Sequence, residues 1–172
     1  QAIGHTECDN TTASAAVDAG ADVITHLFNA MPSIHHRKPG PVPPMLTDSR
    51  GVCELICDGV HLAPDVIRMA MSSAGPKRIA LVTDAMSATG QPDGDYILGS
   101  LPVKVVDGRA RLLAADGSLG AIAGSTLTMG RAVEFVTSVV GIPLGQVAVM
   151  AATTPAKLHG LNEVGVIEEG HW

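Results

Sequence analysis

Four short apolar runs in the first half of the chain each lead into a histidine or an aspartate. The runs cover residues 2–4, 23–25, 52–60 and 79–83, and the residues that close them are His5, His26, His61 and Asp84. Each run is nearly continuous and contains β-branched residues, which is typical of a strand buried on both faces. The pattern predicts four buried strands, each with a polar side chain where it ends.

Helical patterns separate these strands. Residues 11–19 follow a capping Asn10 or Thr11, and a second segment, residues 64–74, stops at Gly75. Alternating strands and helices predict an α/β fold with a parallel sheet, which is either an open doubly wound sheet or a barrel. In a barrel the catalytic groups lie where the strands end, so the four closing residues are candidate site residues.

The pattern changes after the fourth run. Residues 96–114 alternate between apolar and polar positions and contain Asp107-Gly108, which predicts a β-hairpin. A helix is expected to start at Ser125, because apolar residues from Leu127 onwards lie on roughly one face. A second helix is expected over residues 144–152, followed by a short turn at 155–159.

The two ends suggest part of a longer protein. The chain opens without a methionine, inside its first predicted strand, and residues 165–172 form a predicted strand and turn with no partner strand after them.

Composition narrows the class of protein. With 46% hydrophobic and 16% charged residues, the 172-residue chain can form a packed domain. A net charge of −6 and only 2% aromatic residues argue against a nucleic-acid partner, and no apolar run has the roughly 20 residues that span a membrane. The chain has three cysteines, and an odd number that cannot all pair in disulfides suggests reduced thiols in a cytoplasmic protein.

The closing residues have types that suit hydrolytic chemistry. Two imidazoles on successive strand ends, His5 and His26, can form half of a divalent-metal site, although each could also be an ordinary polar group. Asp84 is either a helix cap or a general acid/base. His61 follows a flexible Asp58-Gly59 turn and could stabilise an oxyanion.

Two loops could bind an anion. Arg37 and Lys38 suit a phosphate, although an exposed basic loop is the simpler interpretation. Residues 120–125 precede a predicted helix, whose free N–H groups could hold an anion or sugar hydroxyls. The remaining histidines have no matching context, and they are His35, His36, His159 and His171.

Six motifs occur in an order that resembles the N-acetylglucosamine-6-phosphate deacetylases of the amidohydrolase superfamily. They are Gly4-His5-Thr6, Thr25-His26-Leu27-Phe28-Asn29-Ala30-Met31, Arg37-Lys38-Pro39-Gly40, Asp58-Gly59-Val60-His61, Leu81-Val82-Thr83-Asp84-Ala85 and Ala123-Gly124-Ser125-Thr126-Leu127-Thr128-Met129. The match runs along essentially the whole chain, and the second and third motifs are the most specific for these deacetylases.

This resemblance implies an architecture. Residues 1–160 would be the C-terminal half of a (β/α)8 metal-dependent hydrolase barrel that includes the hairpin at 96–114. Residues 161–172 would begin a strand of a small β-sandwich domain. The full-length protein would be a cytoplasmic homodimer with no membrane or nucleic-acid partner.

The resemblance also implies a reaction of amino-sugar metabolism, in which the acetamide of N-acetylglucosamine 6-phosphate is hydrolysed to glucosamine 6-phosphate and acetate. His5 and His26 would bind a divalent metal ion, zinc in the first instance, with iron, manganese or cobalt as alternatives. Asp84 would be the catalytic acid/base. The remaining predicted residues would bind the phosphosugar substrate, and they are Asn29, Ala30, Arg37, His61, Ile122, Ala123 and Gly124.

The resemblance is incomplete in one respect. These deacetylases have a further metal ligand, a glutamate on an earlier strand, which this sequence does not contain. The 172 residues alone are therefore expected to bind metal weakly and to be inactive. The alternatives are an amidohydrolase that acts on a different amide or amino sugar and a barrel that binds a sugar phosphate without catalysis.

Overall fold

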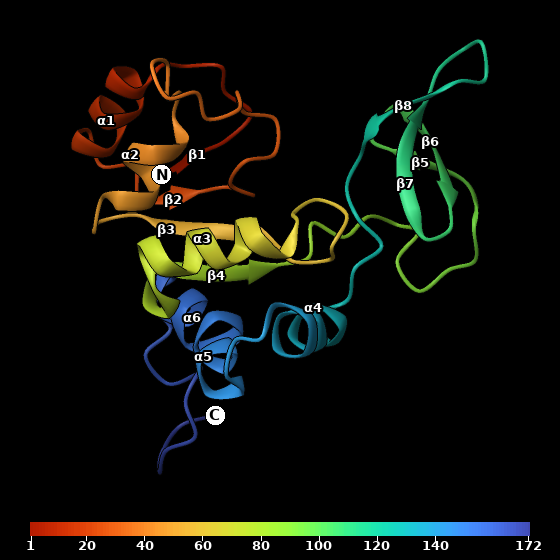
Figure 1. Ribbon diagram of the computed structural model, residues 1–172. Helices are drawn as coiled ribbons and strands as arrows, with labels where there is room; N and C mark the ends of the chain where they lie inside the picture. Colours follow the sequence, from red (N-terminus) through yellow and green to blue (C-terminus); the bar gives the residue numbers. More distant parts are fainter.

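The computed structural model describes residues 1–172 and contains two separate four-stranded sheets (Figure 1). The first sheet is entirely parallel, with the strand order β1-β2-β3-β4, so the predicted α/β class is confirmed. Its strands are β1 (Ala2–Ile3), β2 (Val23–Ile24), β3 (Val52–Ile56) and β4 (Ile79–Val82). The order along the sheet equals the order in the chain, as expected when each strand is followed by a crossover that returns to the next position.

The third strand is shorter than its apolar run. β3 ends at Ile56, because Asp58 and Gly59 turn the chain, and Gly59 has a φ of 74°. Leu55 and Ile56 are fully buried, which explains why the run reads as almost continuously apolar. His61 therefore lies in a turn beyond the strand instead of closing it directly.

Helices cover the parallel sheet and join its strands. α1 begins one residue earlier than predicted, because the Asp9 side chain caps it by accepting a hydrogen bond from the Thr12 N–H group (2.8 Å). α2 lies between β2 and β3 and has no counterpart in the sequence prediction. α3 ends before Gly75 as predicted. The bounds are α1 (Asn10–Asp18), α2 (Val42–Thr47), α3 (Pro64–Ala74) and the 3₁₀ turn η1 (Pro76–Arg78).

The helix predicted from Ser125 begins only at Met129. Thr128 caps it, while Ser125 is 3% exposed and hydrogen-bonded to the segment after β4. The second predicted helix and the turn after it form one continuous helical stretch. The elements are α4 (Met129–Phe135) with the π-helical η2 (Val136–Val140), followed by α5 (Leu144–Ala148), η3 (Val149–Thr153) and α6 (Thr154–Leu158).

The predicted hairpin is part of a larger antiparallel sheet. Its turn at Asp107-Gly108 is confirmed, and both residues have positive φ, as such two-residue turns require. A further turn at Gly99 divides the first predicted strand, and the segment expected to be a loop forms the fourth strand. The strands are β5 (Gly94–Leu98), β6 (Leu101–Val106), β7 (Arg109–Leu113) and β8 (Leu119–Ile122).

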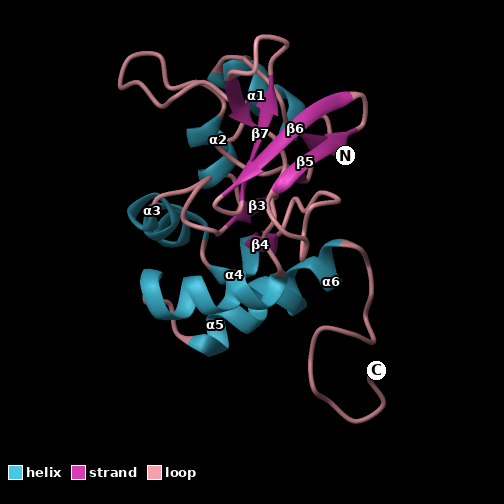
Figure 2. Ribbon diagram, turned by 90° about the vertical axis from the view of Figure 1, so that its right-hand side faces the viewer, coloured by secondary structure: helices cyan, strands magenta, loops and turns pink.

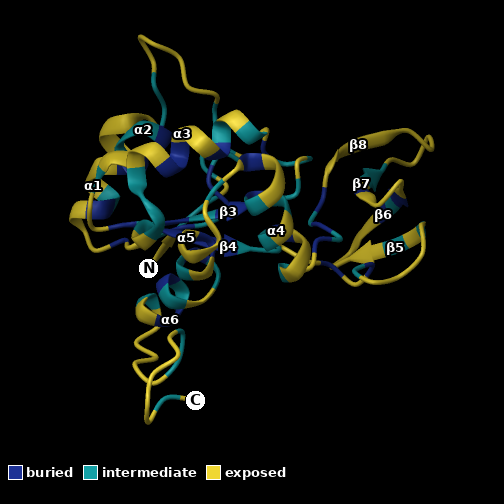
Figure 3. Ribbon diagram, turned by 60° about the horizontal axis from the view of Figure 1, so that its bottom comes forward, coloured by how far each residue is buried: buried dark blue, intermediate teal, exposed yellow.

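The antiparallel sheet lies beyond the carboxyl ends of the parallel strands (Figure 1). Each sheet has its own core: 22 buried residues between the parallel sheet and its helices, and six under the antiparallel sheet. In Figure 3 the strands β3 and β4 are largely buried, whereas the helices expose their outer faces. Most of the predicted site residues line a cavity between the two sheets.

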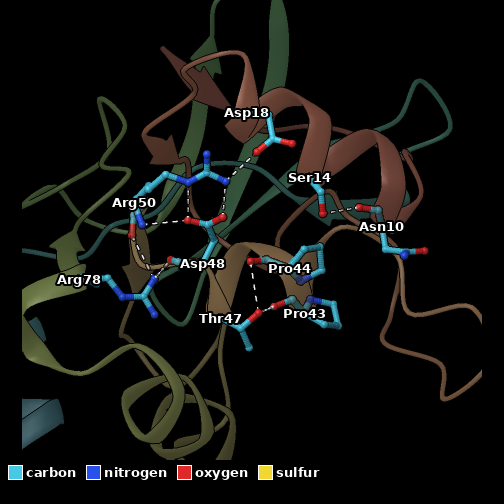
Figure 4. Close-up of polar contacts among 10 residues, drawn as sticks. Asn10, Ser14, Asp18, Pro43, Pro44, Thr47, Asp48, Arg50 and Arg78 are labelled. Carbon is cyan, nitrogen blue, oxygen red and sulfur yellow. Dashed lines mark hydrogen bonds and ion pairs between the residues drawn. The ribbon is translucent and has the colours of Figure 1, made fainter.

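The amino ends of the parallel strands carry an arginine-centred network (Figure 4). Arg50 pairs with Asp48 (2.6 Å) and with Asp18 at the end of α1 (2.8 Å). Arg78, just before β4, donates hydrogen bonds to four backbone carbonyls, including those of Leu46 (2.5 Å) and Gly51 (3.2 Å). This network joins the loops that enter the sheet, at the end opposite to the candidate site.

The last residues depart from the prediction. Residues 161–172 contain turns and bends but no strand, and in Figure 2 they form a loop that extends away from the helices. A strand needs a neighbour for its backbone groups, and the Trp172 N–H group instead bonds to the Glu163 carbonyl within this loop (2.8 Å). No helix of the protein combines the length and apolar character needed to cross a membrane.

Candidate active site

The residues that follow β1, β2 and β4 share an unusual backbone conformation. His5, His26 and Asp84 have φ angles of 45°, 33° and 50°, in the left-handed region that residues other than glycine rarely adopt. Phe28 and Ala30, in the loop after β2, also have positive φ. Such conformations cluster at functional sites, and here they turn the chain sharply at the carboxyl ends of the strands.

The first two strand ends bring two imidazoles together. The Nε2 atoms of His5 and His26 lie 3.0 Å apart, and the rings meet edge to face with centroids 4.8 Å apart. Two nitrogens bound to one zinc ion at about 2.0–2.1 Å in tetrahedral geometry lie about 3.3 Å apart. The pair therefore fits two positions in the shell of one divalent cation.

These imidazoles do not complete a metal site. No group of three or more His, Cys, Asp or Glu side chains is close enough to hold an ion. Nδ1 of His26 is buried without a hydrogen-bond partner, although a metal-bound imidazole normally donates its second N–H group to a neighbour. The residues fit half of a four-coordinate shell, and the other ligands and the partner of Nδ1 must come from other groups.

Asp84 is held in place through its backbone. The Asp84 carbonyl accepts a hydrogen bond from the Ser125 N–H group (2.7 Å), while the Ser125 hydroxyl bonds to the Thr83 carbonyl. The Met86 N–H group donates back to the Ser125 carbonyl (2.9 Å). Asp84 itself is exposed and caps no helix, so its carboxylate is free to act on a molecule in the cavity.

His61 has a carboxylate partner that the sequence analysis left without a role. Its Nδ1 atom lies 2.6 Å from Oδ2 of Asp58, and both side chains are largely buried. Burial opposes the charge of Asp58, but hydrogen bonds from the His61 side chain and from the N–H groups of His61 and Val60 outweigh it, so the Asp58 pKa lies below its usual range. The Asp-Gly-Val-His spacing could have indicated this contact, because an aspartate side chain often accepts hydrogen bonds from the backbone N–H groups two and three residues later.

One cavity of about 540 Å³ collects most of the predicted residues. Its walls come from the carboxyl ends of the parallel strands and from the antiparallel sheet. The predicted residues among them are His5, His26, Asn29, Ala30, His61, Asp84, Ile122, Ala123 and Gly124. The others, which sequence reasoning missed, are mainly apolar and lie on β3, after β4 or in the antiparallel sheet: Ile56, Ala85, Leu98, Leu101, Leu112 and Ala121.

The loop after β2 contributes only its first part to this cavity. The Asn29 side chain donates to the backbone carbonyls of His26 (3.1 Å) and Leu27 (3.3 Å), which fixes the turn. Arg37 does not line the cavity: it is exposed, and its guanidinium lies 2.6 Å from Nε2 of His36. The structure thus brings together every predicted site residue except Arg37.

The segment of Ile122, Ala123 and Gly124 enters the site as the end of β8, not as a helix N-terminus. Gly124 has a φ of 62°, and a Cβ atom there would lie 3.3 Å from the Asp84 carbonyl oxygen. A glycine thus allows this segment to lie against the backbone that carries Asp84.

Comparison with known proteins identifies relatives of this chain, although no family model matches it. It is 39% identical over 171 residues to N-acetylglucosamine-6-phosphate deacetylase of Vibrio furnissii, covering 99% of this chain and 41% of that protein. It is 38% identical over 139 residues to a putative N-acetylgalactosamine-6-phosphate deacetylase of Escherichia coli K12, covering 81% of this chain and 80% of that protein.

The chain belongs to the N-acetylglucosamine-6-phosphate deacetylase family. Among solved structures it is similar to a Mycobacterium smegmatis member, an aspartate-to-alanine mutant in complex with N-acetyl-D-glucosamine 6-phosphate. The two share 44% identity with a TM-score of 0.88, over 95% of this chain and 43% of that one. The family resemblance inferred from the motifs is confirmed. The chain spans about two fifths of the length of the Vibrio and Mycobacterium deacetylases that it matches.

Proposed function

We propose that the full-length protein hydrolyses the acetamide of N-acetylglucosamine 6-phosphate to glucosamine 6-phosphate and acetate. The observation that carries this proposal is the single cavity that joins His5, His26, His61 and Asp84. Family membership supports it, because the relatives are named for this deacetylation. N-acetylgalactosamine 6-phosphate is the second candidate substrate, since some relatives are named for it.

His5 and His26 would hold a divalent metal ion through their facing Nε2 atoms. Imidazole nitrogens suit zinc first, and they also bind iron, manganese or cobalt. When bound, such an ion polarises the amide carbonyl and makes water a stronger nucleophile. Two histidine ligands fill half of a four-coordinate shell, so the 172 residues by themselves would bind the ion weakly.

Asp84 would move the proton. An exposed carboxylate on the cavity wall can accept a proton from the attacking water and return it to the departing amine. His61 would donate a hydrogen bond to the carbonyl oxygen as negative charge develops there. Both groups act on the same amide, which requires them to lie on one cavity, as they do.

The remaining predicted residues would position the phosphosugar. Asn29 and Ala30, from the loop after β2, line the cavity together with residues 122–124, from the end of β8 and the segment after it. Arg37 would bind the phosphate, which holds the substrate at a point far from the reacting bond and uses that binding to orient the acetamide. Its exposed position leaves the guanidinium available for an anion.

We also propose that the parallel sheet is half of a (β/α)8 barrel and that residues 161–172 lead towards a small β-sandwich domain. Four parallel strands in sequence order, with the candidate site at their carboxyl ends, support the barrel. A cytoplasmic homodimer is the expected state of the full-length protein.

The direct test is acetate release by the full-length protein with added zinc. The substrates are N-acetylglucosamine 6-phosphate, N-acetylgalactosamine 6-phosphate and unphosphorylated N-acetylglucosamine. We expect turnover of a phosphorylated sugar and much weaker turnover of the unphosphorylated one. Substrate binding without acetate release from any of them would instead indicate a non-catalytic sugar-phosphate-binding protein.

Asp84→Asn tests the assignment of the proton-transfer residue. The amide cannot take a proton from water, so kcat should fall by about 10²–10⁴-fold while substrate binding is largely kept. Arg37→Ala is the matched comparison, because it should raise KM for the phosphorylated sugar with a smaller effect on kcat. A near-normal kcat in Asp84→Asn would rule out the assignment.

A further inference from the structure

The two carboxylate oxygens of Asp58 have separate partners. Oδ1 accepts hydrogen bonds from the backbone N–H groups of Val60 and His61, both at 2.8 Å, which closes the turn after β3. Oδ2 lies 2.6 Å from Nδ1 of His61. One side chain thus shapes the loop and also contacts the imidazole that the loop presents.

This geometry determines where the proton of His61 lies. An ionised carboxylate can only accept hydrogen bonds, so the proton shared with Asp58 must be carried by Nδ1 of His61. The lowered pKa of Asp58 keeps it ionised at neutral pH. Nε2 is the ring nitrogen left without a protein partner, and His61 lines the cavity.

We propose that Asp58 is a positioning residue that fixes the tautomer of His61, so that neutral His61 presents a bare Nε2 atom towards the cavity. This inference rests on the proposed function. It follows that His61 donates a hydrogen bond to the substrate carbonyl only when it carries both ring protons, with Asp58 balancing the charge.

An Asp58→Asn variant should reverse this tautomer. The two backbone N–H groups need an acceptor, so the amide oxygen would take the place of Oδ1 and the NH₂ group would face Nδ1. Nδ1 must then accept, and the single proton of neutral His61 moves to Nε2. The variant keeps the turn but inverts the hydrogen-bonding character of the ring.

Other charged groups lie near this pair and would affect its titration. His5, His26 and Asp84 share the cavity with His61, and a bound cation would add to their influence. On the outer side, Arg131 and Glu134 of α4 line a groove that also includes Asp58. A tautomer is set by the direct contact at Nδ1, so it is a cleaner readout than a titration midpoint.

The first experiment measures the tautomer directly. The full-length, zinc-loaded protein is labelled with ¹⁵N-histidine, the His61 signals are assigned with His61→Gln, and long-range ¹H–¹⁵N correlations identify the protonated nitrogen at a pH where His61 is neutral. We expect the proton on Nδ1 in the native protein and on Nε2 in Asp58→Asn. Asp65→Asn, an exposed carboxylate on α3, is the matched control and should leave the native pattern.

The second experiment measures kcat and KM. An amide at position 58 cannot balance the charge of a doubly protonated His61, so Asp58→Asn replaces a charged donor with a neutral Nε2–H donor. Its kcat should be about tenfold to a hundredfold lower, with KM changed less than about threefold, because a neutral donor stabilises a developing negative charge less well. Asp58→Ser can keep the turn with its hydroxyl, and it should lose activity because Nδ1 has no carboxylate.

The outcomes separate the two proposals. An Nε2–H tautomer in native neutral His61, or an Nδ1–H tautomer in Asp58→Asn, would overturn the role of Asp58. A kcat of Asp58→Ser equal to that of the native protein would also overturn it, because the turn without a carboxylate would then be sufficient for activity. If the native protein releases no acetate, the proposed function fails while the tautomer measurement remains valid.

Discussion

At the scale of single residues, the candidate site depends on side chains whose surroundings restrict them. His5, His26 and Asp84 follow their strands in a left-handed conformation that costs energy for non-glycine residues. The Asp84 carbonyl accepts a hydrogen bond from the Ser125 N–H group, which holds that backbone in place. The same residue types on a flexible loop would not hold one geometry.

The three cysteines should differ strongly in reactivity. Burial raises the pKa of Cys53 to about 11, and burial together with the charge of Asp58 raises that of Cys57 to about 12. A raised pKa means less thiolate, which is the reactive form, whereas Cys8 is only partly buried. At pH 8, peptide mapping after brief alkylation should find Cys8 modified first.

Slow modification of the other two cysteines should follow the unfolding rate, because only unfolding exposes them. Cys8→Ser is the control, and it should remove the fast phase. Fast labelling of Cys53 or Cys57 in the folded protein would contradict the buried environment described for β3.

At the scale of elements, α3 illustrates how two glycines of similar conformation differ in packing. Gly59, before the helix, and Gly75, after it, have φ angles of 74° and 72°. A Cβ atom on Gly59 would lie 2.8 Å from the Phe135 ring, whereas one on Gly75 would meet nothing within 4 Å. The pair separates backbone strain from collision.

We expect Gly75→Ala to lower the free energy of unfolding by about 1 kcal/mol, from backbone strain alone. Gly59→Ala should lower it by about 2–4 kcal/mol, because the ring of Phe135 on α4 must also move. Urea unfolding of both variants provides the measurement. Equal effects would show that Phe135 adapts without cost.

The network at the amino ends of the strands should be structural. Arg78→Met removes a partly buried guanidinium from four backbone carbonyls, so it should lower the free energy of unfolding by about 2–4 kcal/mol. Arg50→Met is the matched control, because Arg50 is 54% exposed and its ion pairs are screened by solvent. A larger decrease in the free energy of unfolding in Arg50→Met than in Arg78→Met would contradict this prediction.

At the scale of the whole molecule, the two ends of the parallel sheet carry different kinds of residue. Arginine and aspartate pairs join the loops at the amino ends, while histidines and Asp84 gather at the carboxyl ends. The antiparallel sheet contributes apolar side chains such as Leu101 and Leu112 to the cavity at the second end. Both sheets therefore contribute to the lining of the candidate site.

Metal removal should abolish activity if His5 and His26 hold the ion. Full-length protein treated with a chelator should lose deacetylase turnover, and added zinc should restore it. His5→Gln and His26→Gln should each lower the bound metal per protein, measured by atomic absorption, while His159→Gln, outside the cavity, should not. Full turnover in protein shown to be free of metal would contradict the proposed chemistry.

Much of the fold and of the site could be predicted from the sequence. The strands β3 and β4 stand out as nearly continuous apolar runs because most of their residues are buried, although the short β1, also expected to be buried, is partly exposed. The turn at Asp107-Gly108 has a specific conformational requirement. The predicted start of α4 at Ser125 was wrong, because the Ser125 hydroxyl donates a tertiary hydrogen bond to the Thr83 carbonyl and does not cap a helix. Residues 161–172, where a strand was expected, contain turns and bends but no strand.

By itself, the sequence determined the α/β class, the family and the positions of His5, His26 and Asp84 after the strands β1, β2 and β4, because burial and backbone conformation leave local patterns. Only the tertiary structure decided that Asp58 contacts His61, that the antiparallel sheet supplies the apolar wall and that Arg37 lies outside the cavity. Those facts depend on how separate segments and side chains meet in space, and the spacing of residues along a chain does not fix such contacts.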